Sequence, residues 1–78
     1  METAMARIQT ENGARNAQVD EYKGRKVEVA TGYDANSDKY PVHIYIDGEK
    51  VVGRFLADNM NEGFDLGFSV AAQEIDRM

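Results

Sequence analysis

The stretch Tyr40-Pro-Val-His-Ile-Tyr-Ile-Asp-Gly-Glu-Lys-Val-Val-Gly-Arg-Phe-Leu-Ala57 decides the fold of this chain. Its first part alternates in polarity, which is typical of a strand with one buried face. The apolar face carries Val42, Ile44 and Ile46. Asp47-Gly48 then supplies residues that tolerate the positive φ angles of a tight hairpin turn. We therefore predict antiparallel strands over residues 40–46 and 51–57.

A further strand is predicted over residues 26–33, where the polarity alternates in the same way. One face carries Val27, Val29, Thr31 and Tyr33, and the other carries Lys26, Glu28 and Ala30. The residues that follow, 34–39, are rich in Asp, Asn and Ser, which favour turns. Pro41 lies close enough to the start of the next strand to be tolerated there. Three strands in this order predict an antiparallel sheet.

A C-terminal helix is predicted over residues 62–77, with Asn59 or Asn61 as its N-cap. Its main apolar stripe consists of Phe64, Phe68, Ala71, Ala72 and Ile75. We expect this stripe to cover the apolar face of the sheet. Gly63 and Gly67 each weaken the helix, so we also expect another part of a backbone to pack closely there. The fold class is therefore α+β, a three-stranded antiparallel sheet packed on a C-terminal helix.

Residues 1–21 are predicted to be an N-terminal arm, separate from a single α+β domain over residues 22–78. The arm has few large apolar side chains, but Met1, Met5 and Ile8 fall at helical spacing. We therefore expect the arm to be flexible or to form a short helix over about residues 2–11. With that helix, the order of elements would be α-β-β-β-α.

The composition excludes several classes of protein. The chain has 78 residues and no cysteine, which fits one small domain without disulfides or thiolate metal sites. No stretch approaches the roughly 20 apolar residues of a membrane-spanning helix, and the start lacks the pattern of a secretory signal. We expect a cytoplasmic protein that binds no membrane.

The charge of the chain is unevenly distributed. Residues 1–28 carry five basic and five acidic side chains, so the net charge of −5 falls on residues 29–78. This excess of negative charge disfavours a broad phosphate-binding surface.

Two surfaces are candidates for binding. The first is the sheet face away from the helix, where basic and aromatic residues are expected together. Its candidate binding residues are Lys26, His43, Tyr45 and Arg54. The second is a narrower apolar edge of the helix, formed by Leu66 and Val70, which point away from Phe64. Each surface has two interpretations, because it could be covered by the N-terminal arm or could contact a partner.

Residues that could carry catalysis or bind a metal ion are scarce. His43 is the only histidine, and no nucleophile can be paired with it, so we predict no catalytic residue and no cofactor. Asp34-Ala-Asn-Ser-Asp38 matches the first alternating ligands of an EF-hand, but Lys39 stands where that loop requires glycine. We therefore interpret this segment as a turn and predict no metal site.

The order of elements and the closing helix, which ends in Ser69-Val-Ala-Ala-Gln-Glu-Ile-Asp-Arg77, resemble a double-stranded-RNA-binding domain. In that family, lysines at the start of the last helix contact phosphates, whereas the matching residues here include Glu62 and Asp65. The resemblance implies the fold, with RNA binding through an atypical, non-basic helix start. The Tyr22-Lys-Gly24 opening and the Asp47-Gly48 hairpin also look like small stand-alone bacterial proteins of unknown function, a likeness that names no activity.

We predict a non-enzymatic interaction or regulatory module that binds a protein partner, or a second copy of itself, through one of the two candidate surfaces. The alternative is a nucleic-acid-binding domain. The residues that would contact nucleic acid are Lys23, Arg25, Lys26, Tyr45 and Arg54. Catalysis is the least favoured function, since no acid–base pair can be named.

Overall fold

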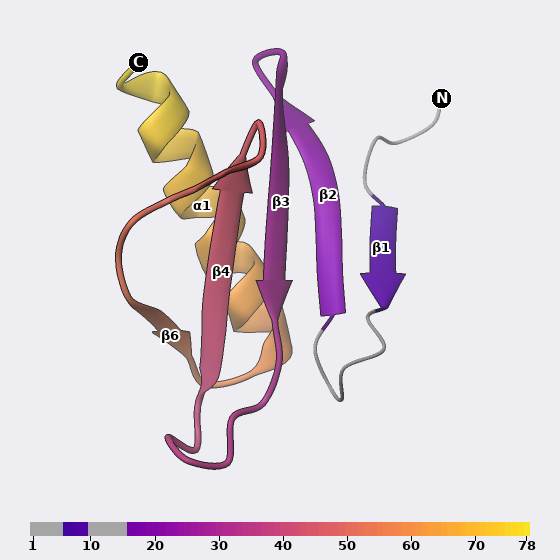
Figure 1. Ribbon diagram of the computed structural model, residues 1–78, viewed down its shortest axis with the longest axis vertical. Coiled ribbons are helices and arrows are strands. Elements are labelled where there is room, and N and C mark those ends of the chain that lie inside the picture. Colours follow the sequence, from indigo (N-terminus) through magenta and orange to yellow (C-terminus); the bar gives the residue numbers. More distant parts are fainter. Residues whose placement is uncertain (1–5, 10–15) are drawn as a thin grey trace.

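The computed structural model describes the backbone of residues 6–9 and the whole of residues 16–78, and it shows an antiparallel sheet packed against one helix (Figure 1). The elements are β1 Ala6–Gln9, β2 Asn16–Tyr22, β3 Arg25–Thr31, β4 Tyr40–Ile46, β5 Glu49–Lys50, β6 Phe55–Ala57 and α1 Met60–Asp76. The helix lies behind β3 and β4 in Figure 1 and covers one face of the sheet. The predicted α+β class is therefore confirmed.

Two tight turns set the register of the central strands. Asp47 and Gly48 have φ angles of 52° and 87° and join β4 to β5, which confirms the predicted hairpin turn. Lys23 and Gly24, with φ angles of 53° and 79°, join β2 to β3 in the same way. Positive φ at both central positions gives a turn whose twist matches that of the flanking strands. The hairpins β2–β3 and β4–β5 therefore need no further loop residues, whereas β3 and β4 are joined by the longer loop over residues 32–39.

The apolar sides of β3, β4 and α1 meet in one core. Its buried members are Val27, Val29, Val42, Ile44, Ile46, Ala57, Phe64, Ala71 and Ile75. The predicted helix stripe is confirmed, with Phe68 and Ala72 half-buried at its margins. The helix begins earlier than predicted, because Asn59 is the N-cap and accepts a hydrogen bond from the Glu62 backbone N–H at 2.9 Å. Within the described residues, no helix has the length and apolar character needed to cross a membrane.

The alternation predicts Tyr33 on the buried face of the strand, but the structure places it outside β3. β3 ends at Thr31, and Tyr33 stands 49% exposed in the following loop. Its ring meets that of Tyr40 edge-on, with the ring centres 5.5 Å apart, and its hydroxyl donates to Asp38 at 2.7 Å. The prediction fails because the strand ends two residues early, at Thr31, and Gly32 and Tyr33 belong to the loop that follows.

The N-terminal arm contributes strands to the sheet. β2 pairs with β3 along its whole length, from Asn16 opposite Thr31 to Tyr22 opposite Arg25, so the domain boundary predicted at residue 22 is wrong. β1 pairs with β2, and Ala6–Gln9 is therefore a strand within the range predicted as a helix, residues 2–11. The other residues of that range lie outside the described residues. The sequence of β2 conceals its strand character because polar side chains occupy both of its faces.

The last predicted strand, over residues 51–57, is not continuous. β5 and β6 pair with the two ends of β4, and between them residues 51–54 lie opposite only residues 43 and 44 of β4. Two extra residues therefore bulge from the outer strand, and Figure 1 shows the chain swinging away from β4 there. Gly53 permits the bulge, because its φ is 145° and a Cβ atom would lie 2.8 Å from the Phe55 ring.

Two glycines let α1 lie directly on β3. Gly63 packs over Thr31, where an added Cβ atom would lie 2.9 Å from the Thr31 Oγ1 atom. Gly67 packs even more closely over the side chain of Val29. Both glycines are buried, and neither position leaves room for a methyl group. Close packing at the two glycines is therefore found within this domain, but the neighbours are side chains of β3 and not the backbone that we predicted.

The Gly67→Ala variant should be less stable than the wild type by about 1–3 kcal/mol, the usual cost of overpacking a core. Helix propensity alone predicts the opposite sign, a gain of about 1 kcal/mol. Ser69→Ala, at an exposed position of the same helix, is the matched control and should change the free energy of unfolding little. Urea denaturation followed by circular dichroism measures both, and a stabilised Gly67→Ala protein would contradict the close packing.

Thr31 is fully buried, and its hydroxyl oxygen has no hydrogen-bond partner among the described residues. An unsatisfied buried hydroxyl costs about 1–3 kcal/mol. Thr31→Val keeps the shape of the side chain and removes the hydroxyl, so we expect a higher free energy of unfolding. Thr31→Ser keeps the hydroxyl and loses a methyl group, and it should lower stability by about 1 kcal/mol. Destabilisation by both substitutions would show that the hydroxyl is satisfied in solution.

Candidate functional site

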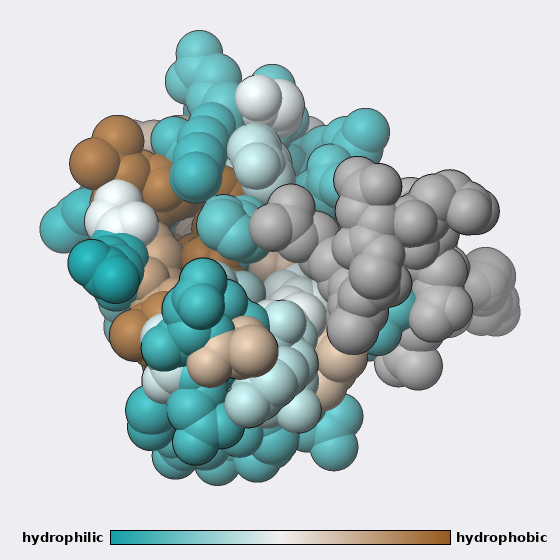
Figure 2. Space-filling view, turned by 60° about the horizontal axis from the view of Figure 1, so that its bottom comes forward, coloured by the Kyte–Doolittle hydropathy of each residue, from teal (hydrophilic) through white to brown (hydrophobic). Residues whose placement is uncertain are grey.

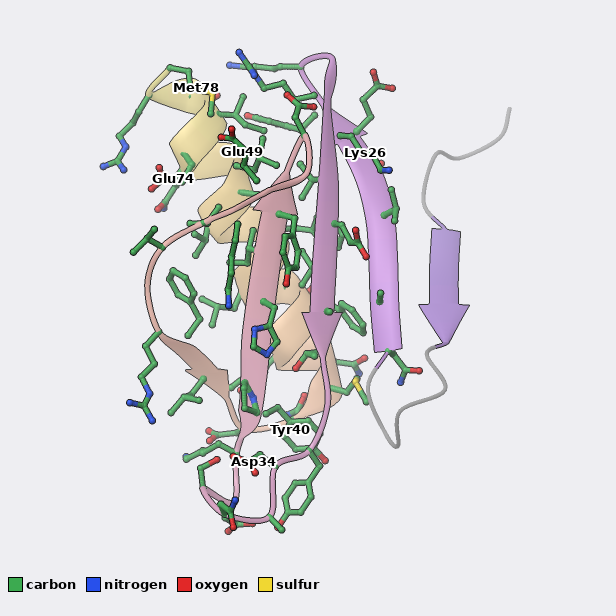
Figure 3. All side chains as sticks on the ribbon, in the orientation of Figure 1. Lys26, Asp34, Tyr40, Glu49, Glu74 and Met78 are labelled. Carbon is green, nitrogen blue, oxygen red and sulfur yellow. The ribbon has the colours of Figure 1, made fainter. Side chains whose placement is uncertain are left out.

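The open face is the side of the sheet opposite α1. Ala30 pairs with His43 and Glu28 pairs with Tyr45, which places these β3 and β4 side chains together on this face. Lys26 lies on the same face, near the end of the sheet formed by the β2–β3 turn (Figure 3). The structure therefore brings three of the predicted binding residues to one surface. His43 and Tyr45 are half-buried there, whereas Lys26 is exposed.

Charges on the open face are balanced around Lys26. This lysine lies directly opposite Glu21 of β2, and Glu28 follows two residues along β3 on the same face. Side chains directly opposite or two residues apart on one face of a sheet are neighbours. The ammonium group of Lys26 is thus placed among carboxylates, which reduces the attraction of this part of the face for phosphates.

A groove lies where β4 loses its outer neighbour, and we call it the edge groove. It has a volume of about 210 Å³, and its lining includes Asp34, Pro41, His43, Lys50, Arg54 and Leu56. Arg54, predicted to lie on the open face, belongs instead to the bulged segment and reaches that face only at this edge. The structure therefore joins His43 and Arg54 in one groove, and neither Lys26 nor Tyr45 lines it.

Exposed apolar side chains gather along the same edge. Val52 is 94% exposed and Leu56 is 42% exposed, and both belong to the segment that forms the outer border of β4. Figure 2 shows the hydrophobic surface at its left edge, the side on which Figure 1 places the chain between β5 and β6. Sequence reasoning predicted a continuous strand here and missed the bulge that exposes both residues. The signal was Gly53, since a glycine inside a strand pattern often marks a bulge.

The edge groove carries a local excess of positive charge. Neither Lys50 nor Arg54 makes an ion pair with any described residue. Asp34 also lines the groove, but its two carboxylate oxygens accept hydrogen bonds from the Asn36 backbone N–H at 3.2 Å and the Ser37 hydroxyl at 3.1 Å. The carboxylate of Asp34 is therefore used within its own turn.

A second and larger hollow, of about 410 Å³, lies between β5 and the end of α1. Glu49, Glu74 and Met78, labelled together in Figure 3, are among its lining residues. Lys50 and Arg77 also line it, and Arg77 forms an ion pair with Glu74. Two acidic and two basic side chains line this hollow, so it has no charge preference.

The second predicted surface is less available than the first. Leu66 and Val70 are half-buried and pack against the core of the domain. The sequence left two interpretations for this edge, cover by the N-terminal arm or contact with a partner. The structure shows that the edge is covered, and the neighbour is the core of the domain. Little apolar surface remains on this edge of α1 for a partner.

The residues predicted to contact nucleic acid do not form one surface. Arg25 lies on the α1 side of the sheet, since it is two residues from Val27, and its guanidinium pairs with Asp47 at 3.0 Å. The Lys23 ammonium pairs with Asp76 at the end of α1, with a distance of 2.6 Å between Nζ and Oδ1. Two of the four cations in that hypothesis are therefore neutralised by nearby carboxylates, away from Tyr45.

The loop over residues 34–39 is a closed turn. Asp34 accepts the Asp38 backbone N–H at 2.8 Å and donates its own N–H to the Lys39 carbonyl at 2.9 Å. Lys39 also pairs with Asp58 at 2.6 Å, which fixes the loop beside the start of α1. Within the part of the chain that the structure describes, no group of three or more histidine or acidic side chains could hold a metal ion.

No protein-family model, curated protein or solved structure matches this chain. The similarity to double-stranded-RNA-binding domains therefore stays a prediction, and the site is interpreted from its own geometry.

The contact between Lys23 and Asp76 predicts a pH dependence. The hydrogen bond from Lys23 lowers the pKa of the Asp76 carboxyl, and the same contact raises the pKa of Lys23. Stability from the lowered carboxyl pKa is complete above the pKa of Asp in the unfolded chain and is lost as pH falls through the lowered value. Stability from the raised Lys23 pKa is lost only as pH rises through that raised value.

We expect the Asp76 pKa, measured by NMR on the side-chain carboxyl carbon, to rise in the Lys23→Met variant. Lys26→Met removes the same charge from the opposite side of the sheet and should leave the Asp76 pKa unchanged. An Asp76 pKa that is the same in wild type and Lys23→Met would show that the ion pair is not populated in solution.

Proposed function

We propose that this domain is a non-enzymatic interaction module that binds a partner protein through the open face and the adjoining edge groove. The proposal rests on the one-sided cover of the sheet. α1 packs on β3 and β4 from one side only, while His43 and Tyr45 stay half-exposed and Leu56 stays exposed on the other side.

The composition of this surface suits a protein partner. Tyr45 offers an aromatic ring with a polar end, a type of residue that is enriched in the centre of protein interfaces. Leu56 and Val52 add apolar area at the edge, and charged side chains surround them. An aromatic and apolar centre with a charged rim is the usual anatomy of a specific interface.

The placement of the cations argues against nucleic acid as the partner. Lys23 and Arg25 are held in ion pairs, and Lys26 lies opposite Glu21. Affinity for nucleic acid comes mainly from clustered cations that displace counterions. Among the described residues, Lys26, Lys50 and Arg54 make no ion pair, and Lys26 is separated from the other two, which line one small groove.

Selection from a random-peptide display library tests the proposal. The wild-type domain should enrich peptides that bind the Tyr45→Ala variant about tenfold or more weakly, the effect expected when a central aromatic residue is lost. Gln73→Ala, at an exposed position of α1, is the matched control and should bind the same peptides with unchanged affinity. Circular dichroism would verify that both variants are folded.

Two further measurements identify a different partner. A sedimentation experiment in which wild type self-associates and Tyr45→Ala does not would identify a second copy of the chain as the bound protein. Titration with short RNA and DNA at low and high salt covers the alternative. Salt-dependent binding of nucleic acid, with no peptide enriched, would contradict the proposal.

A further inference from the structure

The edge groove has a shape and charge that specify the kind of partner, an inference that rests on the proposed function. We propose that this groove binds a short acidic segment of a partner protein and accepts one large apolar side chain from it. The acidic groups would lie against Lys50 and Arg54, and the apolar side chain would pack on Pro41 and Leu56.

The size of the groove favours a side chain over a small-molecule ligand. Its volume of about 210 Å³ falls below the roughly 300–1,000 Å³ of pockets that bind small molecules. A groove of this size holds one large side chain of a peptide. Val52, immediately before the bulge glycine and almost fully exposed, lines the adjoining larger hollow and offers apolar surface there to neighbouring residues of the bound segment.

The local charge favours an acidic segment even though the chain has a net charge of −5. Exposed charges at physiological salt act over a Debye length of about 8 Å, so the residues around the groove decide the attraction. Those residues include Lys50 and Arg54, both without an ion pair among the described residues, and Asp34 is the one acidic side chain that the described lining contains. The fork of the Arg54 guanidinium matches a carboxylate in two parallel hydrogen bonds.

The backbone holds these groups in place before binding. Gly53 has a φ of 145° and lies against the Phe55 ring, and β6 anchors the next residues on β4. On the other side, β5 anchors Lys50 opposite Tyr45. Arg54 is therefore confined to a short segment tied to β4 at both ends, which reduces the entropy lost when a ligand binds.

The larger hollow beside α1 does not compete for this partner. Glu49 and Glu74 balance the charges of Lys50 and Arg77, so this hollow has no excess of positive charge to attract an acidic segment. Lys50 lines both sites, whereas Arg54 lines the edge groove and not the larger hollow. Substitution of Arg54 therefore separates them.

The test uses peptides selected by the wild-type domain from a random-peptide display library, with affinities measured by fluorescence anisotropy. We expect the selected peptides to be rich in Asp and Glu beside one large apolar residue. The double variant Lys50→Glu/Arg54→Glu should bind them about tenfold more weakly, and Arg54→Ala about threefold, because exposed charge pairs contribute modestly. Arg77→Glu, which reverses an exposed charge at the end of α1, outside both the open face and the groove, is the matched control and should bind them unchanged.

The outcomes separate this inference from the proposed function. Selected peptides without an acidic excess, or acidic peptides that bind the double variant as well as wild type, would overturn the acidic partner. In either case, if the selected peptides bind the Tyr45→Ala variant more weakly than wild type, the open face remains an interaction surface. Only the inference about the edge groove then fails. Selection of basic peptides by the double variant in place of acidic ones would be the strongest support.

Discussion

The close packing of α1 on β3 is the constraint on which the rest of the structure depends. Gly63 and Gly67 bring the helix onto Thr31 and Val29 with no room for a methyl group. Because the helix is seated this close, its other buried residues reach the core between α1 and the sheet. Phe64, Ala71 and Ile75 do so. The same packing assigns the faces of the sheet, because the helix covers the side of β3 and β4 that carries Val29 and Ile44, and His43 and Tyr45 therefore lie on the opposite side.

β2 joins this arrangement through its full-length pairing with β3, and its few contacts with α1 include polar ones at both ends of the strand. At one end, the Asn16 amide donates to the Met60 sulfur at 3.7 Å, and at the other, Tyr22 and Lys23 both donate to the Asp76 carboxylate. A single acidic side chain thus links the β2–β3 turn to the last turn of the helix. Such exposed contacts each add little stability, but they fix the position of a strand that presents few apolar residues to the core.

The sequence is sufficient to predict the elements with strong alternation or clear turn signals. β4, the Asp47-Gly48 turn and the apolar stripe of α1 are all as predicted, and the predicted strand over residues 26–33 is right except at Tyr33. β2 could not be recognised because Gln18 is buried, and its neighbours on the same face are also polar.

The open face was predictable at Lys26, His43 and Tyr45, since the alternation of side chains along a strand is enough to place them on one face. The edge groove was not, because it arises from a two-residue slip in the pairing of the outer strand, which depends on the contact of Gly53 with the Phe55 ring.

That slip also determines how the sheet ends. An uninterrupted border strand would offer a straight row of backbone amides and carbonyls on which the strand of another molecule could grow. Here the border consists of two short pieces, of two and three residues, separated by a bulge with a positively charged side chain. A foreign strand would find no continuous line of donors and acceptors at this margin. The irregularity that creates the groove therefore also makes this edge of the sheet a poor template for the strand of another molecule.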